Sequence, residues 1–92
     1  MRESTIEKHL VKRVKALGGE VRKVQWIGRR GAPDRLVMLP GSVQWSRTTW
    51  VELKAPGVPP EPHQLREHKR MRAMGQRVVV IDSIEGVEEL LT

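Results

Sequence analysis

The sequence predicts an α/β protein in which helices flank a mixed central sheet. Three observations support this fold: an apolar stripe with helical spacing near the N-terminus, a continuous apolar run at residues 77–82, and a helical segment between that run and an earlier strand. A strand, a helix and a second strand in succession form a parallel crossover, for which right-handed packing is expected. With 92 residues, the chain is expected to form one domain, residues 1–92, with a modest core.

The first predicted element is a helix over residues 4–17. Ser4 and Glu7 have the spacing of a capping box, and Gly18 and Gly19 end the helix. Its apolar stripe recurs every three to four residues at Ile6, Leu10, Val14 and Leu17.

Three strands are predicted next, over residues 20–27, 34–39 and 48–54, with a loop at 28–33. Pro40 and Gly41 stop the second strand, and a turn or hairpin connection leads to the third. Residues 56–62 hold four prolines and one glycine, which break regular structure and indicate a rigid rim beside a site.

The last three elements are a helix, a strand and a short helix. Residues 63–74 form a helix with an apolar side of Leu65, Met71 and Met74, and Gly75 ends it. Residues 77–82 are typical of a buried strand, and Ser83 caps the C-terminal helix. The predicted order is therefore αβββαβα.

Composition limits the possible functions. The chain has no cysteine, which excludes disulfides, cysteine-ligated zinc and thiol nucleophiles and is consistent with a cytoplasmic setting. No apolar run is long enough for a membrane span. The net charge is +6, and residues 1–82 carry 17 basic against 8 acidic residues, a balance that favours a polyanionic partner. Solubility alone is the alternative reason for this charge.

Two carboxylates and an ammonium are the candidate site. Asp34 begins one strand and Glu52 lies near the end of the next, so antiparallel pairing would bring both to the same sheet edge. Glu52 and Lys54 are two residues apart and share a strand face. Carboxylate oxygens are hard ligands that suit Mg²⁺ or Mn²⁺. The alternative is a surface turn at Asp34 with an exposed pair between Glu52 and Lys54.

Three motifs occur in order on the expected elements: Gly-Ala-Pro-Asp-Arg-Leu-Val (31–37), Trp-Val-Glu-Leu-Lys-Ala-Pro-Gly (50–57) and His-Gln-Leu-Arg-Glu-His-Lys (63–69). With them, the chain resembles a stand-alone VRR-NUC domain of the PD-(D/E)XK nuclease superfamily, from about Arg2 to Ile84. This nuclease module also occurs in the Fanconi-associated nuclease and alone in phages and bacteria.

The resemblance implies a restriction-endonuclease-like αβββαβ core and a role for each motif residue. Asp34, Glu52 and the Leu53 carbonyl would bind Mg²⁺ or Mn²⁺, while Lys54 would orient the attacking water. Glu7 matches the first-helix acid, with Glu3 as its rival one turn earlier. Gln64 matches a helical glutamine that would contact Lys54 or the phosphate. Two alternatives stay open: Glu7 as partner of Ser4 in the capping box, and Gln64 as an ordinary first-turn residue.

The basic side chains around these motifs are expected to contact DNA phosphates, with a solvated surface as the alternative for each. They are Arg29, Arg30, Arg35, His63, Lys69, Arg70 and Arg72. The three histidines His9, His63 and His68 lack the spacing of a zinc site.

The expected function is a Mg²⁺- or Mn²⁺-dependent endodeoxyribonuclease that selects DNA by its structure, in a bacterial or phage-infected cell. A homodimer that resolves Holliday junctions is the leading hypothesis, because one site cuts one strand and two symmetric sites suit a four-way junction. The alternatives are a flap- or end-directed nuclease and a basic DNA-binding module without catalysis.

Overall fold

A four-stranded mixed sheet organises the chain, as predicted. The computed structural model describes residues 1–41 and 48–92. The elements are α1 (Glu3–Ala16), β1 (Glu20–Lys23), β2 (Arg35–Met38), β3 (Thr49–Leu53), α2 (Pro62–Ala73), β4 (Val78–Ile81) and α3 (Ile84–Leu91). The strand order is β1-β2-β3-β4, with two antiparallel pairs followed by the parallel pair β3–β4. The turn predicted between β2 and β3 falls on residues 42–47, outside the described residues.

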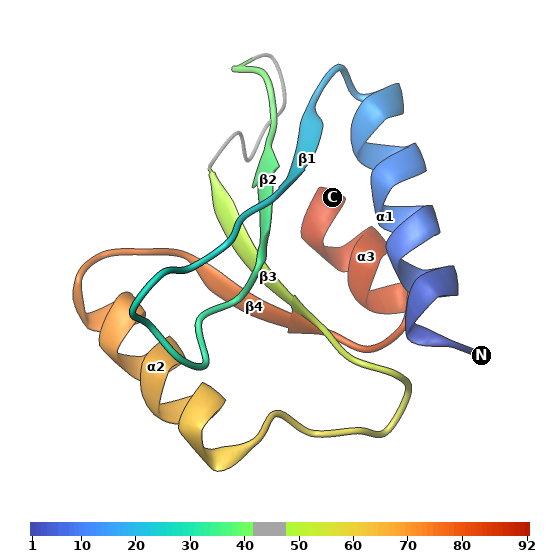
Figure 1. Cartoon of the computed structure of the whole chain (residues 1–92). Helices are drawn as coiled ribbons and strands as arrows, with labels where there is room; N and C mark the ends of the chain where they lie inside the picture. Colours follow the sequence, from blue (N-terminus) through green and yellow to red (C-terminus); the bar gives the residue numbers. More distant parts are fainter. Residues whose placement is uncertain (42–47) are drawn as a thin grey trace.

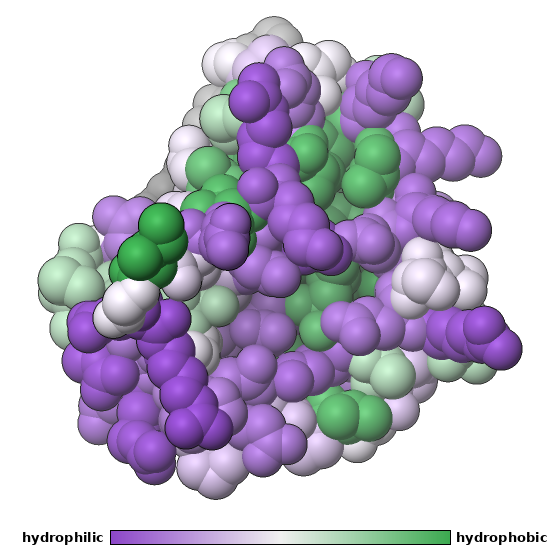
Figure 2. Space-filling model, viewed as in Figure 1, coloured by the Kyte–Doolittle hydropathy of each residue, from purple (hydrophilic) through white to green (hydrophobic). Residues whose placement is uncertain are grey.

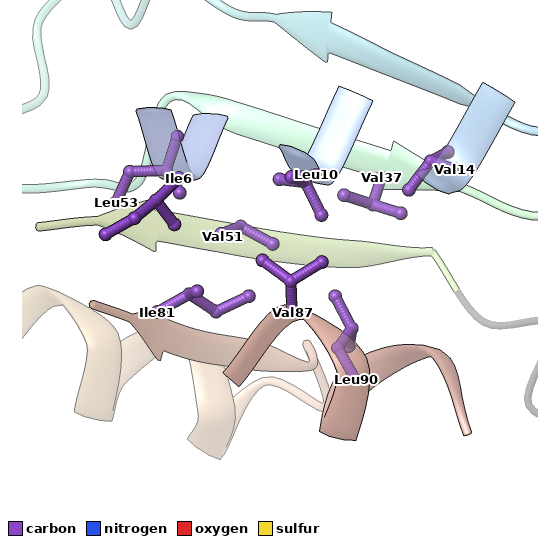
Figure 3. Close-up of a cluster of buried hydrophobic side chains, with 9 residues drawn as sticks. All are labelled: Ile6, Leu10, Val14, Val37, Val51, Leu53, Ile81, Val87 and Leu90. Carbon is purple, nitrogen blue, oxygen red and sulfur yellow. The ribbon is translucent and has the colours of Figure 1, made fainter. Parts of the chain in front are cut away.

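The two faces of the sheet are covered by different helices. Helices α1 and α3 lie on one face, and α2 lies on the other side (Figure 1). Alternate residues of β2 and β3 point to the first face, where Val37 and Val51 are fully buried. Figure 3 shows them between the helices in one apolar cluster. The cluster comprises Ile6, Leu10, Val14, Val37, Val51, Leu53, Ile81, Val87 and Leu90.

The start of α1 differs from the prediction. The helix begins at Glu3, its N-cap is Arg2, and no side chain caps it, so the predicted capping box of Ser4 and Glu7 is wrong. The Arg2 carbonyl instead accepts hydrogen bonds from the N–H groups of Thr5 and Ile6. Glu7 is bound by Arg35 of β2, and this tertiary ion pair replaces the local contact that the spacing predicted.

The buried side of α2 also differs from the prediction. Met71 is buried, but Leu65 and Met74 are 52% and 66% exposed, so the predicted apolar side is wrong for both. Glu67 and His68 are buried in their place. The side of α2 that faces the protein interior is thus set by polar contacts rather than by the spacing of its apolar residues.

Strand β4 is an edge strand, and its apolar run is only partly buried. Val78 and Ile81 are buried, whereas Val80 is 38% exposed. At the following helix, the Ser83 hydroxyl accepts a hydrogen bond of 2.9 Å from the Gly86 N–H, which confirms the predicted cap. Among the described residues, no helix is both long enough and apolar enough to cross a membrane.

A close approach at Gly19 gives a test of the packing of α1 against the sheet. A Cβ atom at Gly19 would lie 2.3 Å from the Met38 carbonyl oxygen, whereas one at Gly41 would meet no atom of residues 1–41 and 48–92 within 4 Å. We expect Gly19→Ala to destabilise the protein by about 1–3 kcal/mol through overpacking, and Gly41→Ala to have little effect. Urea unfolding curves of the two variants check this, and equal midpoints would contradict the packing described.

Candidate active site

The pairing of β2 with β3 places Asp34 opposite Glu52. Arg35 pairs with Val51, and Leu36 pairs with Trp50. One step further along this register, Asp34 faces Glu52, and residues opposite each other in an antiparallel pair share a sheet face. The Asp34 carbonyl also accepts a hydrogen bond of 2.9 Å from the Val24 N–H, which fixes its backbone. The register thus brings the two acidic residues to the same edge of the sheet.

Glu52 is the most perturbed acid of the site. It is 9% exposed, and burial raises its pKa to about 7; Lys54 opposes this shift, and the negative charges of Asp34 and Glu3 add to it. Lys54 follows two residues later, and its N–H donates to the Ile81 carbonyl at 3.0 Å, which anchors it beside β4. Two carboxylates thus approach one another with an ammonium nearby.

Arg35 joins the sheet to the first helix. Its guanidinium contacts the Glu7 carboxylate and lies 2.7 Å from Asp34 Oδ1, and its side chain is only 15% exposed. Burial disfavours its charge, but Glu7 and Asp34 outweigh this effect and raise the pKa of Arg35 above its ordinary value. Arg35, predicted as a DNA contact, therefore has two carboxylate partners within the protein.

Both first-helix acids lie at one small pocket. It has a volume of about 170 Å³ and is lined by Glu3, Ser4, Glu7, Arg35 and Leu53. Glu7 is bound by Arg35, whereas Glu3 acts on Glu52 through its charge. The structure thus brings each of the two rival acids to the end of β3.

The carboxylates of Asp34 and Glu52 are ligands of the kind that a hard divalent cation prefers, but they are only two. In residues 1–41 and 48–92, no three His, Cys, Asp or Glu side chains are grouped so that they could hold a metal ion. Two carboxylates, Asp34 and Glu52, face each other across two strands; burial is the main cause of the raised pKa of Glu52, and the negative charge of Asp34 adds to it. This arrangement fits a cation that takes its remaining ligands from backbone carbonyls, water and phosphate, as Mg²⁺ commonly does.

A buried histidine, His68, lies behind Glu52, and the sequence had given it no role beyond excluding it from a zinc site. His68 is fully buried, and neither of its ring nitrogens has a hydrogen-bond partner among the described residues. Its Nε2 lies 3.5 Å from Glu52 Oε1. Burial and the nearby Arg72 charge lower the pKa of His68, so the ring is neutral at pH 7. Unsatisfied buried polar groups are costly and concentrate at functional sites.

Gln64 has a local role at the start of α2. Its side-chain oxygen accepts a hydrogen bond of 2.8 Å from the Glu61 N–H and forms part of a capping box. This contact corresponds to the alternative in which Gln64 is a first-turn polar residue. This hydrogen bond also holds Gln64 at the point where the segment after Lys54 ends and α2 begins.

Besides Arg35, three of the predicted DNA-contacting arginines make internal hydrogen bonds. Arg29 and Arg70 bind different carboxylate oxygens of Glu67, with Nε–Oε distances of 3.0 Å each. Arg72 donates two hydrogen bonds to the Val78 carbonyl, at 3.1 and 2.8 Å. Arg30 and Lys69 are exposed, and His63 is half-buried. Figure 2 shows a strongly hydrophilic surface over α2.

Glu67 anchors the loop that leads into Asp34. No pattern in the sequence predicted that Glu67 is buried. We call residues 24–34 the Asp34 loop. The Glu67–Arg29 pair ties the middle of this loop to α2, and the Trp26 indole donates to the Pro33 carbonyl at 2.9 Å. At Gly31, a Cβ atom would lie 2.8 Å from the His63 carbonyl oxygen, so only glycine fits there.

The fold and the site together define a class, the restriction-endonuclease-like nuclease domains with an αβββαβ core. No family model matches the sequence. The chain is 52% identical over 83 residues to "Putative nuclease p44" of Acyrthosiphon pisum secondary endosymbiont phage 1, covering 90% of this chain and 85% of the phage protein. A solved structure described as "VRR_NUC domain" superposes with a TM-score of 0.81 at 45% identity, covering 96% of this chain and 91% of that one. The chain belongs to the VRR-NUC family.

The anchoring role of Glu67 gives a pH-dependent prediction. Burial disfavours ionisation of Glu67, but hydrogen bonds from Arg70 and Arg29 outweigh it and lower the pKa of Glu67. Its ionised form therefore stabilises the fold above the unfolded pKa of about 4.3, and this stabilisation is lost as the pH falls through the lower folded pKa. We expect Glu67→Gln to cost about 1–3 kcal/mol at pH 7 and much less at pH 3. Urea unfolding at both pH values checks this, with the exposed Glu85→Gln as the control. A cost that does not change with pH would contradict the anchoring role.

For Glu52, we expect the opposite dependence of stability on pH. Its folded pKa of about 7 lies above the unfolded value, so the stability of the wild type falls as the pH rises through 7. In EDTA, we expect Glu52→Gln to be more stable than the wild type at pH 8, by on the order of 3 kcal/mol, and to show little difference at pH 4. Thermal unfolding across this range checks it. Equal pH profiles would show that Glu52 is not desolvated.

Proposed function

We propose that this protein is a metal-dependent nuclease that hydrolyses DNA phosphodiesters at the site formed by Asp34, Glu52 and Lys54. The observation that carries the proposal is the strand register that sets Asp34 opposite the buried Glu52. The relative named as a nuclease and the VRR-NUC family support the same activity.

In this proposal, Asp34, Glu52 and the Leu53 carbonyl hold Mg²⁺ or Mn²⁺, with Glu7 or Glu3 as a further acid. The bound cation supplies polarisation of the scissile phosphate and a lower pKa for a bound water. Lys54 positions the attacking water and offsets the charge that develops on the phosphate. Gln64 fixes the start of α2 near the phosphate. The Arg35 guanidinium, 2.7 Å from Asp34 Oδ1, helps to fix the position of that carboxylate.

We propose DNA as the substrate because the charge balance favours a polyanion. The exposed Arg30 and Lys69 are the simplest phosphate contacts. Arg29 and Arg70 remain about half exposed, at 47% and 52%, while they bind Glu67, so their free N–H groups can also reach phosphate. The proposed setting is the cytoplasm of a bacterial or phage-infected cell.

The proposed structure-selective activity is Holliday junction resolution by a homodimer. One site of this size cuts one strand, and a symmetric pair of sites would nick two strands across a four-way junction. A flap- or end-directed nuclease is the alternative within the same chemistry, and the two differ in which substrate is cut.

A cleavage assay tests the proposal with Lys54→Ala as the active-site variant and Lys8→Ala, an exposed residue of α1, as the matched control. We expect Mn²⁺-dependent nicks on a labelled four-way junction, an approximately 100-fold or greater loss of rate in Lys54→Ala, and no loss in Lys8→Ala. EDTA should abolish cutting. Gel-resolved products of junction, flap and linear duplex DNA provide the measurement.

The products separate the alternatives. Paired symmetric nicks on the junction support a resolvase dimer, whereas cutting confined to flaps or ends contradicts it. DNA that is bound but never cut in Mg²⁺ or Mn²⁺ would overturn catalysis and indicate a DNA-binding module. Equal activity of Lys54→Ala and the wild type would remove Lys54 from the site.

A further inference from the structure

Ile27 is the most exposed large hydrophobic side chain among the described residues. It is 92% exposed, compared with 72% for the N-terminal Met1 and 66% for Met74. It lies in the Asp34 loop, next to Gly28, which has φ +73° and turns the backbone. Single exposed apolar residues are common in proteins, so exposure alone does not give Ile27 a function.

The residues on either side of Ile27 in the Asp34 loop are anchored. On one side, the Trp26 ring packs on Trp50 with 5.1 Å between centroids, and its indole donates to the Pro33 carbonyl. On the other side, Arg29 is paired with the buried Glu67. A β-branched side chain on an anchored backbone loses little conformational entropy when it enters a partner. Ile27 is therefore presented outward and cannot fold back onto the core.

The surroundings of Ile27 suit nucleic acid. A groove of about 510 Å³ next to it is lined by Lys23, Val24, Gln25, Trp26 and Asp34. Arg29 and Arg30 lie two and three residues after Ile27 in the chain, and both are exposed. A protein partner would need a broad apolar patch rather than one side chain. DNA differs, because one apolar side chain can contact its stacked bases while neighbouring cations contact its phosphates.

We propose that Ile27 is a wedge that inserts between two base pairs where DNA stacking is already broken, beside the phosphate presented to Asp34. The inference rests on the proposed nuclease function and deepens it, because it supplies a basis for structure selectivity. In linear duplex, insertion must first unstack a base step, which costs free energy, whereas at a branch point that cost is reduced. A rigid wedge next to the site therefore favours branched over linear DNA.

The test compares Ile27→Ala with Ile27→Leu, which retains an apolar wedge, and with Val11→Ala, a 42% exposed apolar residue of α1. Binding of the full chain to a four-way junction and to linear duplex of equal length is measured by fluorescence anisotropy in Ca²⁺. A 2-aminopurine at the branch point reports unstacking. We expect Ile27→Ala to lose roughly 10-fold in affinity for the junction and less than about 2-fold for the duplex, and to lose the 2-aminopurine signal. Ile27→Leu and Val11→Ala should resemble the wild type.

The outcomes separate this inference from the proposed function. Junction affinity and 2-aminopurine signal that Ile27→Ala leaves unchanged would overturn the wedge, as would equal losses on junction and duplex, while Mn²⁺-dependent cleavage by the wild type would leave the proposed function standing. A wild type that shows the wedge behaviour but never cuts in Mn²⁺ would overturn the proposed catalysis alone. A wild type that binds neither DNA would overturn both.

Discussion

The antiparallel pairing of β2 with β3 is the constraint on which the site depends. Val37 and Val51 are fully buried on the face covered by α1 and α3, and this burial fixes which residues of the two strands lie opposite each other. Because side chains alternate between faces, a slip of one residue would expose the two valines and move Asp34 away from Glu52. The apolar core on one side of the sheet therefore sets the spacing of the carboxylates on the other. A site built in this way is positioned by the same free energy that folds the domain.

The second face of the sheet is organised by polar contacts rather than by apolar packing. Glu67 is 2% exposed on α2 and binds Arg29 of the Asp34 loop and Arg70 of its own helix. The neighbouring His68 is buried without a hydrogen-bond partner among the described residues and lies 3.5 Å from Glu52. An apolar residue at either position would cost less free energy in a purely structural helix. Polar groups buried at such a cost beside two facing carboxylates are expected where a fold has been adapted to hold a site.

Periodicity and turn chemistry were sufficient to predict the order of elements and the mixed sheet, and antiparallel pairing of two consecutive strands was enough to predict that Asp34 and Glu52 share one sheet edge. These local patterns failed where a distant partner decides the outcome. Glu7 has the spacing of a capping box with Ser4, but Arg35 binds it from a strand 28 residues away. Leu65 and Met74 have the spacing of a buried helix face, but the pairing of Glu67 with Arg29, 38 residues away, sets which side of α2 turns inward. No local pattern marks an ion pair formed across such separations.

The internal partners of the arginines limit how strongly this domain can bind DNA by charge alone. Arg29 and Arg70 bind Glu67, Arg35 binds Glu7 and Asp34, and Arg72 binds the Val78 carbonyl. Each of these contacts reduces the number of donors that face a phosphate, so the net charge of +6 overstates the counterion release available on binding. Affinity for uniform duplex should then be modest, with a weaker salt dependence than the net charge alone would give. Under the proposed function, discrimination must come from features that linear duplex lacks, and Ile27, proposed as a rigid wedge beside the site, would respond to such features through unstacking rather than through charge.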